Sequence, residues 1–327
     1  MATLRRNDHA LTVRDMRRIG VRGYYFRVES VIRLLRTPML KQTRNLLAAA
    51  LLPVIASCTA QPTAPLRLTA EPMPATEACI AGLTSPSGPV SQVLDSGSIR
   101  VVNWNIQKGK STAWVGELAA ENLGPDLLIL QEASQRTDAW QDLVPDHFAS
   151  FAEGFGPNWS PSGVMTVSAA QPMTECELVA HEPWFGTRKA TLVTEYGLTG
   201  SDDTLLVINI HGINFTFGVD ELEKQFSQAR AVIDAHDGPV LFSGDFNTWR
   251  GQRAKVLEEM LSELGLFALE YDVDHRKRFL GSVLDHIYVR GLYSEYATTL
   301  DSQASDHNPM AVQLRLADEP TRVRAAR

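Results

Sequence analysis

Short apolar runs of strand length alternate with helical patterns along the chain from Ser98 onward. Runs of apolar and β-branched residues that are bounded by Gly, Pro, Asn or Asp are typical of strands buried in a sheet. The pattern predicts strands at Ile99–Trp104, Leu127–Leu130, Val164–Val167, Thr191–Tyr196, Leu205–Ile210, Val240–Phe242, Leu284–Val289 and Met310–Leu316.

Three segments between these runs have the spacing of amphipathic helices. The first covers 111–123 and ends before Gly124, the second begins at Asp220, and the third ends at Gly265. Asp220 and Glu223 resemble a capping box, in which two side chains satisfy free backbone N–H groups at the start of a helix. The predicted buried faces are Leu222, Phe226, Ala229 and Ile233 in the second helix and Val256, Leu257, Met260, Leu261 and Leu264 in the third.

The order of these elements predicts the fold class. Several strands follow one another through short polar loops, such as residues 199–203, that favour hairpins. Hairpins join antiparallel neighbours and helical crossovers join parallel ones, so the sheets are expected to be mixed. The expected fold is α/β, a four-layer sandwich of two face-to-face mixed β-sheets flanked by helices, over residues 99–316. Residues 317–327 are expected to be a charged, frayed tail.

The chain before residue 99 differs in composition from this predicted domain. Residues 1–57 hold 11 Lys and Arg against 3 Asp and Glu, within a total net charge of −7, so residues 58–327 carry −15. An acidic body repels polyanions on average, which argues against non-specific binding of duplex DNA or RNA. Residues 58–98 are rich in Pro, with Ala, Thr, Ser and Gly, and are predicted to be a tether.

Residues 39–57 resemble a secretory signal, because two basic residues precede an apolar stretch that is too short to span a bilayer. The sequence Ile-Ala-Ser-Cys that follows resembles the lipobox of bacterial lipoproteins, which makes Cys58 the predicted lipidation site. The alternative is a short buried helix followed by a free thiol. Residues 1–38 are either a misassigned start before Met39 or a basic cytoplasmic stretch before an internal signal. The expected location is the bacterial cell envelope, lipid-anchored and facing the periplasm or the exterior.

Two further cysteines, Cys79 and Cys176, lie downstream of the predicted signal. An oxidising envelope would allow them to form a disulfide. Two unpaired buried thiols are the alternative, because spacing alone does not decide between the two.

Polar residues follow the ends of several apolar runs. Strand ends are positions from which a rigid scaffold directs side chains to one point. Together these residues supply oxygen ligands for a hard cation and two imidazoles, which are the groups that hydrolysis of a phosphoester needs. They are Asn105, Glu132, Asn209, His211, Asp245, Asn247, Asp285, Asp306 and His307.

Each of these residues, taken alone, also has an ordinary structural explanation. Glu132 could form a salt bridge or begin a helix, and Asp285 could form a structural ion pair. Asp245 and Asn247 have the spacing of an Asx turn. His211 could be a buried core histidine, and the last pair of the set could belong to a surface turn. The joint occurrence of all of them favours the functional interpretation.

Seven short motifs carry these residues: Asn-Trp-Asn-Ile at 103–106, Gln-Glu at 131–132, Ser-Gly-Val-Met-Thr-Val-Ser at 162–168, Asn-Ile-His at 209–211, Gly-Asp-Phe-Asn at 244–247, Leu-Asp-His-Ile at 284–287 and Ser-Asp-His at 305–307. As a set they resemble the motifs of the endonuclease/exonuclease/phosphatase superfamily, which has the fold of DNase I. The segments at 161–166 and 214–220 are most similar to an uncharacterised bacterial branch of it. His286, where relatives often have Tyr or Phe, and Ala169, where a basic residue is common, depart from the pattern.

The resemblance implies a metal site. Asn105 and Glu132 would bind Mg²⁺ directly or through water, and Asp306 would lie close to the same cation. Mn²⁺ is the alternative metal. Oxygen-rich ligation suits either ion better than it suits zinc.

The resemblance also implies catalytic roles. Asp245 and Asn247 would orient the attacking water and a phosphoryl oxygen. His307 would be the general base or proton relay, and Asp285 would fix its tautomer. His211 would stabilise charge on the phosphoryl oxygens or assist the leaving group. Asn209 is a further predicted contact of the substrate phosphate.

These expectations combine into a metal-dependent phosphoric ester hydrolase that cleaves a phosphodiester by in-line attack of water. The favoured substrate is a phospholipid headgroup or an envelope phosphodiester, and the other expected partner is the membrane, through the lipid anchor. One alternative is a secreted nuclease that acts on DNA or RNA. A second is a catalytically silent binding lipoprotein. The protein is expected to be a monomer.

Two groups of surface residues bear on the choice of substrate. A basic groove would favour the nuclease, and its candidates are Lys108, Lys110, Arg188 and Lys189. An apolar rim would suit acyl chains or stacked bases, with core packing as the alternative for these side chains. Its candidates are Trp159, Trp184, Phe185, Phe215 and Phe217.

Overall fold

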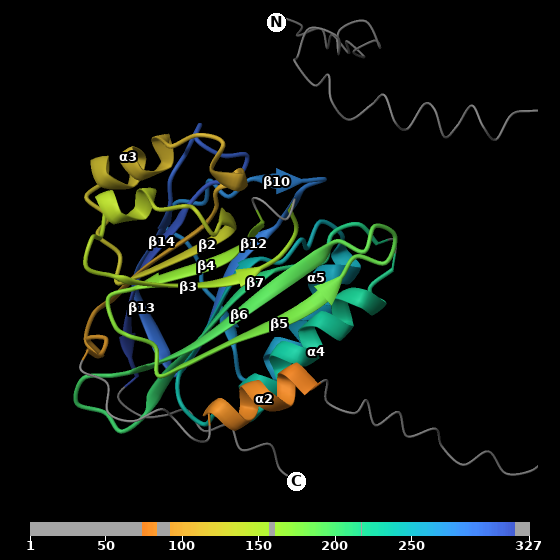
Figure 1. Ribbon diagram of the computed structural model, residues 1–327, viewed down its shortest axis with the longest axis horizontal. Coiled ribbons are helices and arrows are strands. Elements are labelled where there is room, and N and C mark those ends of the chain that lie inside the picture. The colour runs from red at the N-terminus through yellow and green to blue at the C-terminus, as the bar shows by residue number, and fades with distance from the viewer. Residues whose placement is uncertain (1–73, 84–91, 157–160, 217, 318–327) are drawn as a thin grey trace, which may run out of the picture. The chain divides into compact units, whose positions relative to one another are not determined.

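Figure 1 shows a computed structural model of the chain, which describes residues 74–83, 92–156, 161–216 and 218–317. The predicted segments 1–38 and 39–57 and the lipidation site Cys58 lie outside the described residues, as does the tail from residue 318. Within the described ranges, no helix has the length and the apolar character needed to cross a membrane.

The described chain folds into fourteen strands: β1 Ile99–Asn105, β2 Leu127–Ser134, β3 Phe148–Glu153, β4 Ser162–Ser168, β5 Thr174–His181, β6 Arg188–Gly197, β7 Thr204–His211, β8 Val240–Asp245, β9 Phe267–Ala268, β10 Arg278–Phe279, β11 Ser282–Val283, β12 Asp285–Arg290, β13 Leu292–Thr299 and β14 Met310–Leu316. One six-stranded sheet has the order β13-β14-β1-β2-β4-β3, and the other has the order β5-β6-β7-β8-β12-β9. In each sheet one pair is parallel, β1 with β2 and β7 with β8, and the other pairs are antiparallel. The mixed sheets are therefore confirmed.

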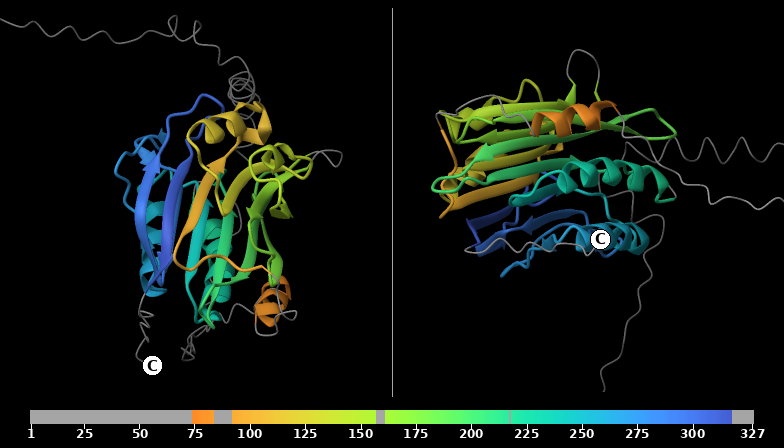
Figure 2. Two further views of the ribbon diagram at one scale, coloured as in Figure 1. Left: turned by 90° about the vertical axis from the view of Figure 1, so that its left-hand side faces the viewer. Right: turned by 90° about the horizontal axis from the view of Figure 1, so that it is seen from below.

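The helices lie on the outer faces of the two sheets (Figure 2). Alternate strand residues face different layers, because successive side chains of a strand point to opposite faces. Val101 packs between the sheets, whereas Val102 packs outward among residues of α3. Phe242 packs on the outer face of the other sheet, against α4 and α5. The helical elements are α2 Pro74–Leu83, η3 Gln107–Gly109, α3 Ala113–Ala120, η4 Ala139–Asp142, α4 Asp220–Asp234 and α5 Gly251–Glu263.

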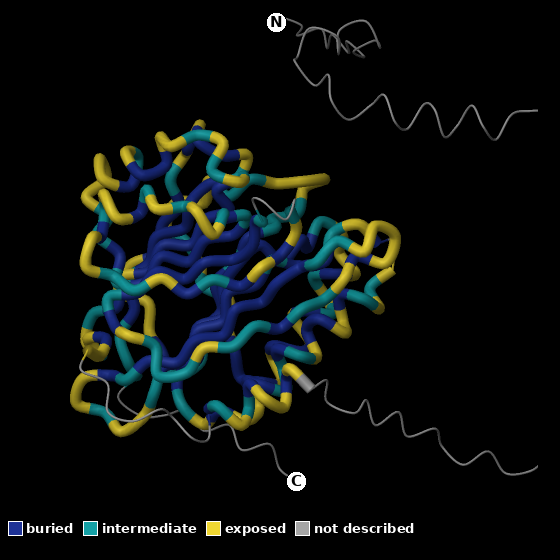
Figure 3. Tube along the Cα trace, viewed as in Figure 1, coloured by how far each residue is buried: buried dark blue, intermediate teal, exposed yellow. Residues whose placement is uncertain are grey.

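This arrangement confirms the four-layer sandwich of two mixed sheets flanked by helices. In Figure 3 the central strands are buried along most of their length, and exposure is concentrated in loops and on outer helix faces. The predicted apolar face of α4 is buried, as is most of the predicted face of α5. Gly265, with φ of 67°, follows the end of α5 as expected.

The predicted capping box at the start of α4 is wrong. The N-cap residue is Val219, and no side chain makes a cap hydrogen bond there. Asp220 and Glu223 lie inside the first turn, where their charges interact favourably with the positive end of the helix dipole.

The segment 58–98, predicted to be a tether, contains the ten-residue helix α2. Cys79 on this helix is buried and forms a disulfide with Cys176 on β5, with a Cα–Cα distance of 5.5 Å. Of the two alternatives for these cysteines, the structure has the disulfide. Leu94, in the same segment, is buried and its backbone N–H bonds to the carbonyl of Gly197.

Candidate active site

Predicted site residues lie at strand ends that meet at one edge of the sandwich. Asn105 ends β1, while His211 and Asp245 end the parallel neighbours β7 and β8. Asp285 begins β12 and pairs with Asp245 across the antiparallel register. Glu132 lies in β2 at a register shift, with φ of 52°. A β-bulge re-aims a side chain at the end of a strand.

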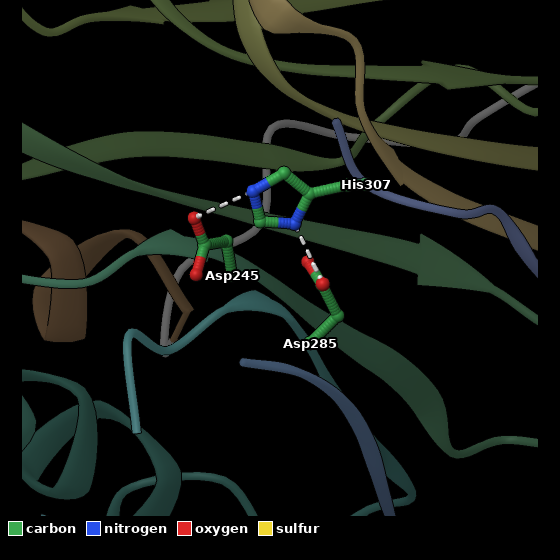
Figure 4. A group of neighbouring side chains, drawn as sticks. All are labelled: Asp245, Asp285 and His307. Atoms are coloured by element: carbon green, nitrogen blue, oxygen red, sulfur yellow. Dashed lines mark hydrogen bonds and ion pairs between the residues drawn. The ribbon is translucent and has the colours of Figure 1, made fainter. Parts of the chain in front are cut away.

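The imidazole of His307 lies between two buried carboxylates, as Figure 4 shows. Its Nδ1 is 2.7 Å from Oδ2 of Asp285, and its Nε2 is 3.9 Å from Oδ2 of Asp245. Burial by itself lowers the pKa of His307, but the neighbouring Asp285 and Asp245 raise it to about 10. Burial raises the pKa of Asp245 to about 6, against the opposing effect of His307. We call Asp245, Asp285 and His307 the carboxylate–histidine cluster.

The backbone around His307 is held at both sides. Its carbonyl accepts a hydrogen bond from the indole N–H of Trp104 at 3.0 Å, and its N–H donates to the hydroxyl of Ser305 at 3.2 Å. The same hydroxyl donates to the carbonyl of Asn105 at 2.6 Å, which ties the loop to the end of β1. Asp306 is exposed, and its carboxylate accepts only a 3.4 Å bond from Ser305 among the described residues. The structure brings His307 into the site, and the negative charge of Asp306 contributes to the raised pKa of His307. The position of Asp306 beside a metal stays a prediction.

Asp245 is fixed by the residues on either side of it. The amide Nδ2 of Asn105 donates to Oδ2 of Asp245 at 3.1 Å, and the backbone N–H of Asn247 donates to Oδ1 at 3.0 Å. The second bond is the Asx turn that the spacing predicted, so here the turn and the site coexist. Gly244 has φ of 149°, and a Cβ there would lie 2.0 Å from the carbonyl oxygen of Ile210. Only glycine lets β7 and β8 approach at this point.

His211 pairs with Lys189, a residue predicted only as part of a basic surface groove. Nζ of Lys189 lies 2.6 Å from Nε2 of His211, which is itself 3.7 Å from Oδ2 of Asp245. Burial, together with the adjacent Lys189, lowers the pKa of His211 well below its usual 6.5, and burial lowers the pKa of Lys189. His211 is therefore neutral at pH 7 and accepts a hydrogen bond from Lys189. The sequence signal that could have placed Lys189 in the site is a basic residue near the start of a strand whose other residues are mostly buried.

Asn209 does not face the site, so its predicted contact with phosphate is not what the structure shows. It is fully buried, its Nδ2 donates to the carbonyl oxygens of Leu130 and Met165, and its Oδ1 accepts from Gln131. Gln131 also donates to Asn103, which accepts from Ser243 as well. We call Asn103, Gln131, Asn209 and Ser243 the amide layer. Its hydrogen bonds join the two sheets.

The donor set fits a hard divalent cation. Asp245, Asp285 and His307 each offer a ligand atom within 4.8 Å of the others. The buried Oδ1 of Asp285 has no hydrogen-bond partner in the described chain. The half-buried carboxylate of Glu132 has no hydrogen bond or ion pair with any described residue. Unpaired carboxylate oxygens beside an amide oxygen are the ligands that Mg²⁺ and Mn²⁺ prefer.

Outside this set, two predicted features have clear structural positions. His286 is half-buried, its Nε2 lies 2.8 Å from Oγ1 of Thr248, and its ring stacks on Tyr288, which is a structural role. Three candidates for the apolar rim, Trp184, Phe185 and Phe215, are exposed rather than core. The other two candidates, Trp159 and Phe217, lie outside the described residues.

The sequence of the chain matches a known protein family over the segment that contains these residues. Residues 102–307 match the model of a family described as the endonuclease/exonuclease/phosphatase family. A UPF0294 protein of Vibrio parahaemolyticus is 36% identical over 226 residues, which cover 68% of this chain and 80% of that protein. A UPF0294 protein of Yersinia pseudotuberculosis is 38% identical over 218 residues, which cover 66% of this chain and 84% of that protein. Neither name states a substrate.

Solved structures share the fold. An endonuclease/exonuclease/phosphatase from Beutenbergia cavernae aligns with a TM-score of 0.53 at 18% identity, over 68% of this chain and 72% of that one. The human Nocturnin catalytic domain with a bound sulfate anion aligns with a TM-score of 0.53 at 17% identity, over 69% of this chain and 96% of that one. At these identities the likeness concerns the fold alone.

Proposed function

The chain belongs to the endonuclease/exonuclease/phosphatase family, and from that premise we propose that it is a Mg²⁺-dependent phosphodiesterase that acts on a phospholipid headgroup or another envelope phosphodiester. Members of this family are generally hydrolases of the nuclease or phosphatase type, and they typically depend on a divalent metal. The observation that carries the proposal is His307 held between Asp245 and Asp285.

The metal would lie beside the cluster. Asn105 and Glu132 are the residues that would hold it, and the exposed Asp306 would contact it at most through water. When bound, the ion would stabilise the negative charge that gathers on the phosphoryl oxygens during displacement.

The protein side chains would handle the water and its proton. Asp245 and Asn247 would orient the attacking water, whose oxygen bonds to phosphorus as the bond to the leaving oxygen breaks. The proton of the water would pass to the carboxylate of Asp245. Protonated His307, whose Nδ1 is fixed by Asp285 at 2.7 Å, would stabilise the charge beside it. The Lys189–His211 pair, 3.7 Å from Asp245, would stabilise the phosphoryl oxygens and protonate the leaving oxygen.

Charge and location support a lipid or envelope substrate. Residues 58–327 carry a net charge of −15, which disfavours a polyanionic substrate. A lipid anchor at Cys58 would hold the enzyme at a membrane of the cell envelope, facing the periplasm or the exterior. Exposed aromatic side chains on the loop before β6 and after β7 adjoin the residues of the site.

The basic groove that would favour a nuclease is weak. Arg188 forms ion pairs with Glu177 at 2.6 Å and Glu153 at 3.7 Å, and Lys189 is buried against His211. Of the four predicted groove residues, only Lys108 and Lys110 are exposed without an ion pair in the described part of the chain.

The test is hydrolysis by the full-length chain with Mg²⁺, offered phosphatidylcholine vesicles and double-stranded DNA in parallel. Headgroup release from the vesicles is expected, and Asp245→Asn should lower it by about 10²–10⁴-fold. Asp203→Asn, an exposed loop carboxylate, is the matched control and should leave the rate unchanged. Cleavage of DNA alone, lost in Asp245→Asn, would make the protein a nuclease. Metal binding without turnover of any phosphoester would leave a binding lipoprotein.

A further inference from the structure

Large apolar side chains are exposed on three segments, at 184–185, 215 and 279–280, that adjoin the site residues in sequence. Their exposed fractions run from 54% for Phe215 to 77% for Leu280. Contiguous exposed apolar surface on a soluble domain often marks a binding or membrane-interaction site. We call this group the apolar collar, and its members are Trp184, Phe185, Phe215, Phe279 and Leu280.

The first half of the collar is built onto the His211 side of the site. The rings of Phe185 and Phe215 meet edge to face, with centroids 6.2 Å apart. The buried carboxylate of Glu182 accepts hydrogen bonds from the backbone N–H groups of Asn214 at 2.7 Å and Phe215 at 2.9 Å. A buried carboxylate with charge-assisted bonds fixes both segments, so the aromatic pair is held outward by the fold.

The second half is built onto the Asp285 side. Phe279 lies in the hairpin β10–β11, which directly precedes β12, and its ring meets that of Trp249 with centroids 6.3 Å apart. Leu280 at the turn of this hairpin has φ of 50° and is followed by Gly281 with φ of 86°. Hairpin turns in this left-handed region favour Asn or Gly. A bulky apolar residue there costs stability, which makes Leu280 a candidate for a role on the surface.

Arg253 connects the two halves. Its buried guanidinium donates to the carbonyl of Asn247 at 2.8 Å and to the hydroxyl of Thr216 at 3.0 Å, and it lies 5.5 Å from the centroid of the Trp249 ring. Trp249 supports Phe279, and Thr216 follows Phe215. The two halves of the collar are thus connected through Arg253 and Trp249, with one half on the His211 side of the site and the other on the Asp285 side.

From these contacts we propose that the apolar collar inserts into the interfacial region of a zwitterionic phospholipid bilayer and so presents the site to lipid headgroups. The inference rests on the proposed function and names the physical state of the substrate. Tryptophan and phenylalanine favour the boundary between headgroups and acyl chains.

The charges near the collar indicate a zwitterionic surface rather than an anionic one. Arg278 pairs with Asp274 at 3.2 Å, and Lys277 pairs with Asp301 at 3.5 Å. The first turn of α4, just after Phe215, is acidic. Asp274 is shared between Arg276 and Arg278, so one of these two charges is left over. Anionic lipids and nucleic acids would nevertheless meet the acidic first turn of α4 and the negative body.

The first test locates Trp184 by fluorescence quenching with vesicles of brominated phosphatidylcholine. The full-length chain carries Cys58→Ser so that no acyl chain is attached, and EDTA prevents hydrolysis. Quenching is expected, and most of it should disappear in Trp184→Phe. The matched control Trp140→Phe, at a buried position on η4, should keep it. Quenching that is identical in both variants would overturn the proposal.

The second test measures vesicle affinity by sedimentation in the same background. Phe185→Ser with Leu280→Ser should lower the affinity for phosphatidylcholine vesicles by about tenfold or more, with little dependence on salt. Tyr293→Ser with Tyr296→Ser removes two exposed rings from edge strand β13 and should leave it unchanged. Equal affinities of the two double variants would overturn docking through the collar. So would a single-stranded oligonucleotide that binds more tightly than vesicles and loses affinity in the first variant.

The two proposals fail separately. Quenching and sedimentation need no turnover, so a protein that hydrolyses nothing but inserts Trp184 keeps the docking surface and loses the proposed function. A protein that hydrolyses a soluble phosphodiester in the presence of Mg²⁺ but shows no quenching keeps the proposed chemistry and loses the docking surface.

Discussion

Two sets of polar residues between the sheets come from the same three strands, β1, β7 and β8, at positions two residues apart. The amide layer contains Asn103, Asn209 and Ser243, and two residues further along the same strands come Asn105, His211 and Asp245. Side chains two apart on a strand share a face, so both groups lie between the sheets. The first group is neutral and its members bond to one another, whereas the second contains a carboxylate and lies beside buried charges from β12 and the loop before β14.

The difference indicates that the amide layer supports the fold, whereas the carboxylate–histidine cluster carries the chemistry. The hydrogen bonds of the amide layer join β1, β2, β7 and β8, and its members are fully buried. The carboxylate–histidine cluster instead contains two carboxylates, with an unpaired oxygen on Asp285, and a shared proton site on His307. Titratable groups with perturbed pKa values mark a reactive site, whereas neutral amides that bond across two sheets support the fold. This holds although Nδ2 of Asn103 and Oε1 of Gln131 have no hydrogen-bond partner among the described residues. Substitutions in the two groups should therefore have opposite signatures.

The largest effect is expected from Asp245→Asn. The amide keeps the shape of the side chain, but it accepts no proton from water and places no negative charge beside His307. The turnover of a phosphodiester should therefore fall by about 10²–10⁴-fold. Steady-state kinetics with Mg²⁺ measure it, and circular dichroism checks that the fold is kept. A higher KM with an unchanged kcat would show that Asp245 binds substrate without taking part in the chemical step.

The next largest effect concerns the pH dependence of the rate. Asp245 must be ionised to accept a proton, and its pKa is raised to about 6, so the rate should fall as pH drops below 6. With one essential ionisation the decrease is about tenfold per pH unit. A pH profile of kcat/KM between pH 4 and 8 measures it. A rate that stays level down to pH 4.5 would exclude Asp245 as the group that must be ionised.

A third effect concerns stability at alkaline pH. The folded-state pKa of His307 is about 10, above its usual 6.5, so its protonation stabilises the fold fully below pH 6.5, and this contribution is lost as pH rises through 10. In EDTA, the free energy of unfolding of the wild type should therefore fall by a few kcal/mol between pH 7 and 10.5 relative to His307→Asn. Urea denaturation of both proteins measures the difference. A difference that is constant with pH would mean that His307 is not charged in the folded protein.

The smallest effect is expected in the amide layer. Asn209→Ala removes bonds to two backbone carbonyls and to Gln131, so it should cost about 1–3 kcal/mol of unfolding free energy. Its turnover should stay within about tenfold of the wild type, because Asn209 does not contact the cluster. Thermal denaturation and kinetics on the same preparation measure both. A large loss of turnover with unchanged stability would return Asn209 to the phosphate site.

The central strands and most of the site could be predicted from the sequence because their signal is local. A strand that is buried on both faces has a nearly continuous apolar sequence. Asn105, His211 and Asp245 each end such a sequence. Edge strands gave no such signal. β3, β5 and β13 have mostly half-buried or exposed residues, so their composition resembles that of loops.

The wrong prediction for Asn209 and the missed role of Lys189 both depend on distances in space, which a sequence pattern does not give. Asn209 and His211 belong to one motif and one face, but the first lies a step deeper between the sheets. Lys189 joins the site from a different strand, 22 positions before His211. Each of these facts depends on the packing of two sheets.

The most direct test of the central claim is the hydrolysis of bis(4-nitrophenyl) phosphate by three full-length proteins: the wild type, Asp245→Asn and Asn209→Ala. Each is stripped with EDTA and then given Mg²⁺, and the soluble substrate removes any influence of membranes. The account predicts turnover that returns with Mg²⁺ in the wild type and in Asn209→Ala and is lost in Asp245→Asn. Undiminished turnover in Asp245→Asn, or no turnover of the wild type with either Mg²⁺ or Mn²⁺, would contradict it.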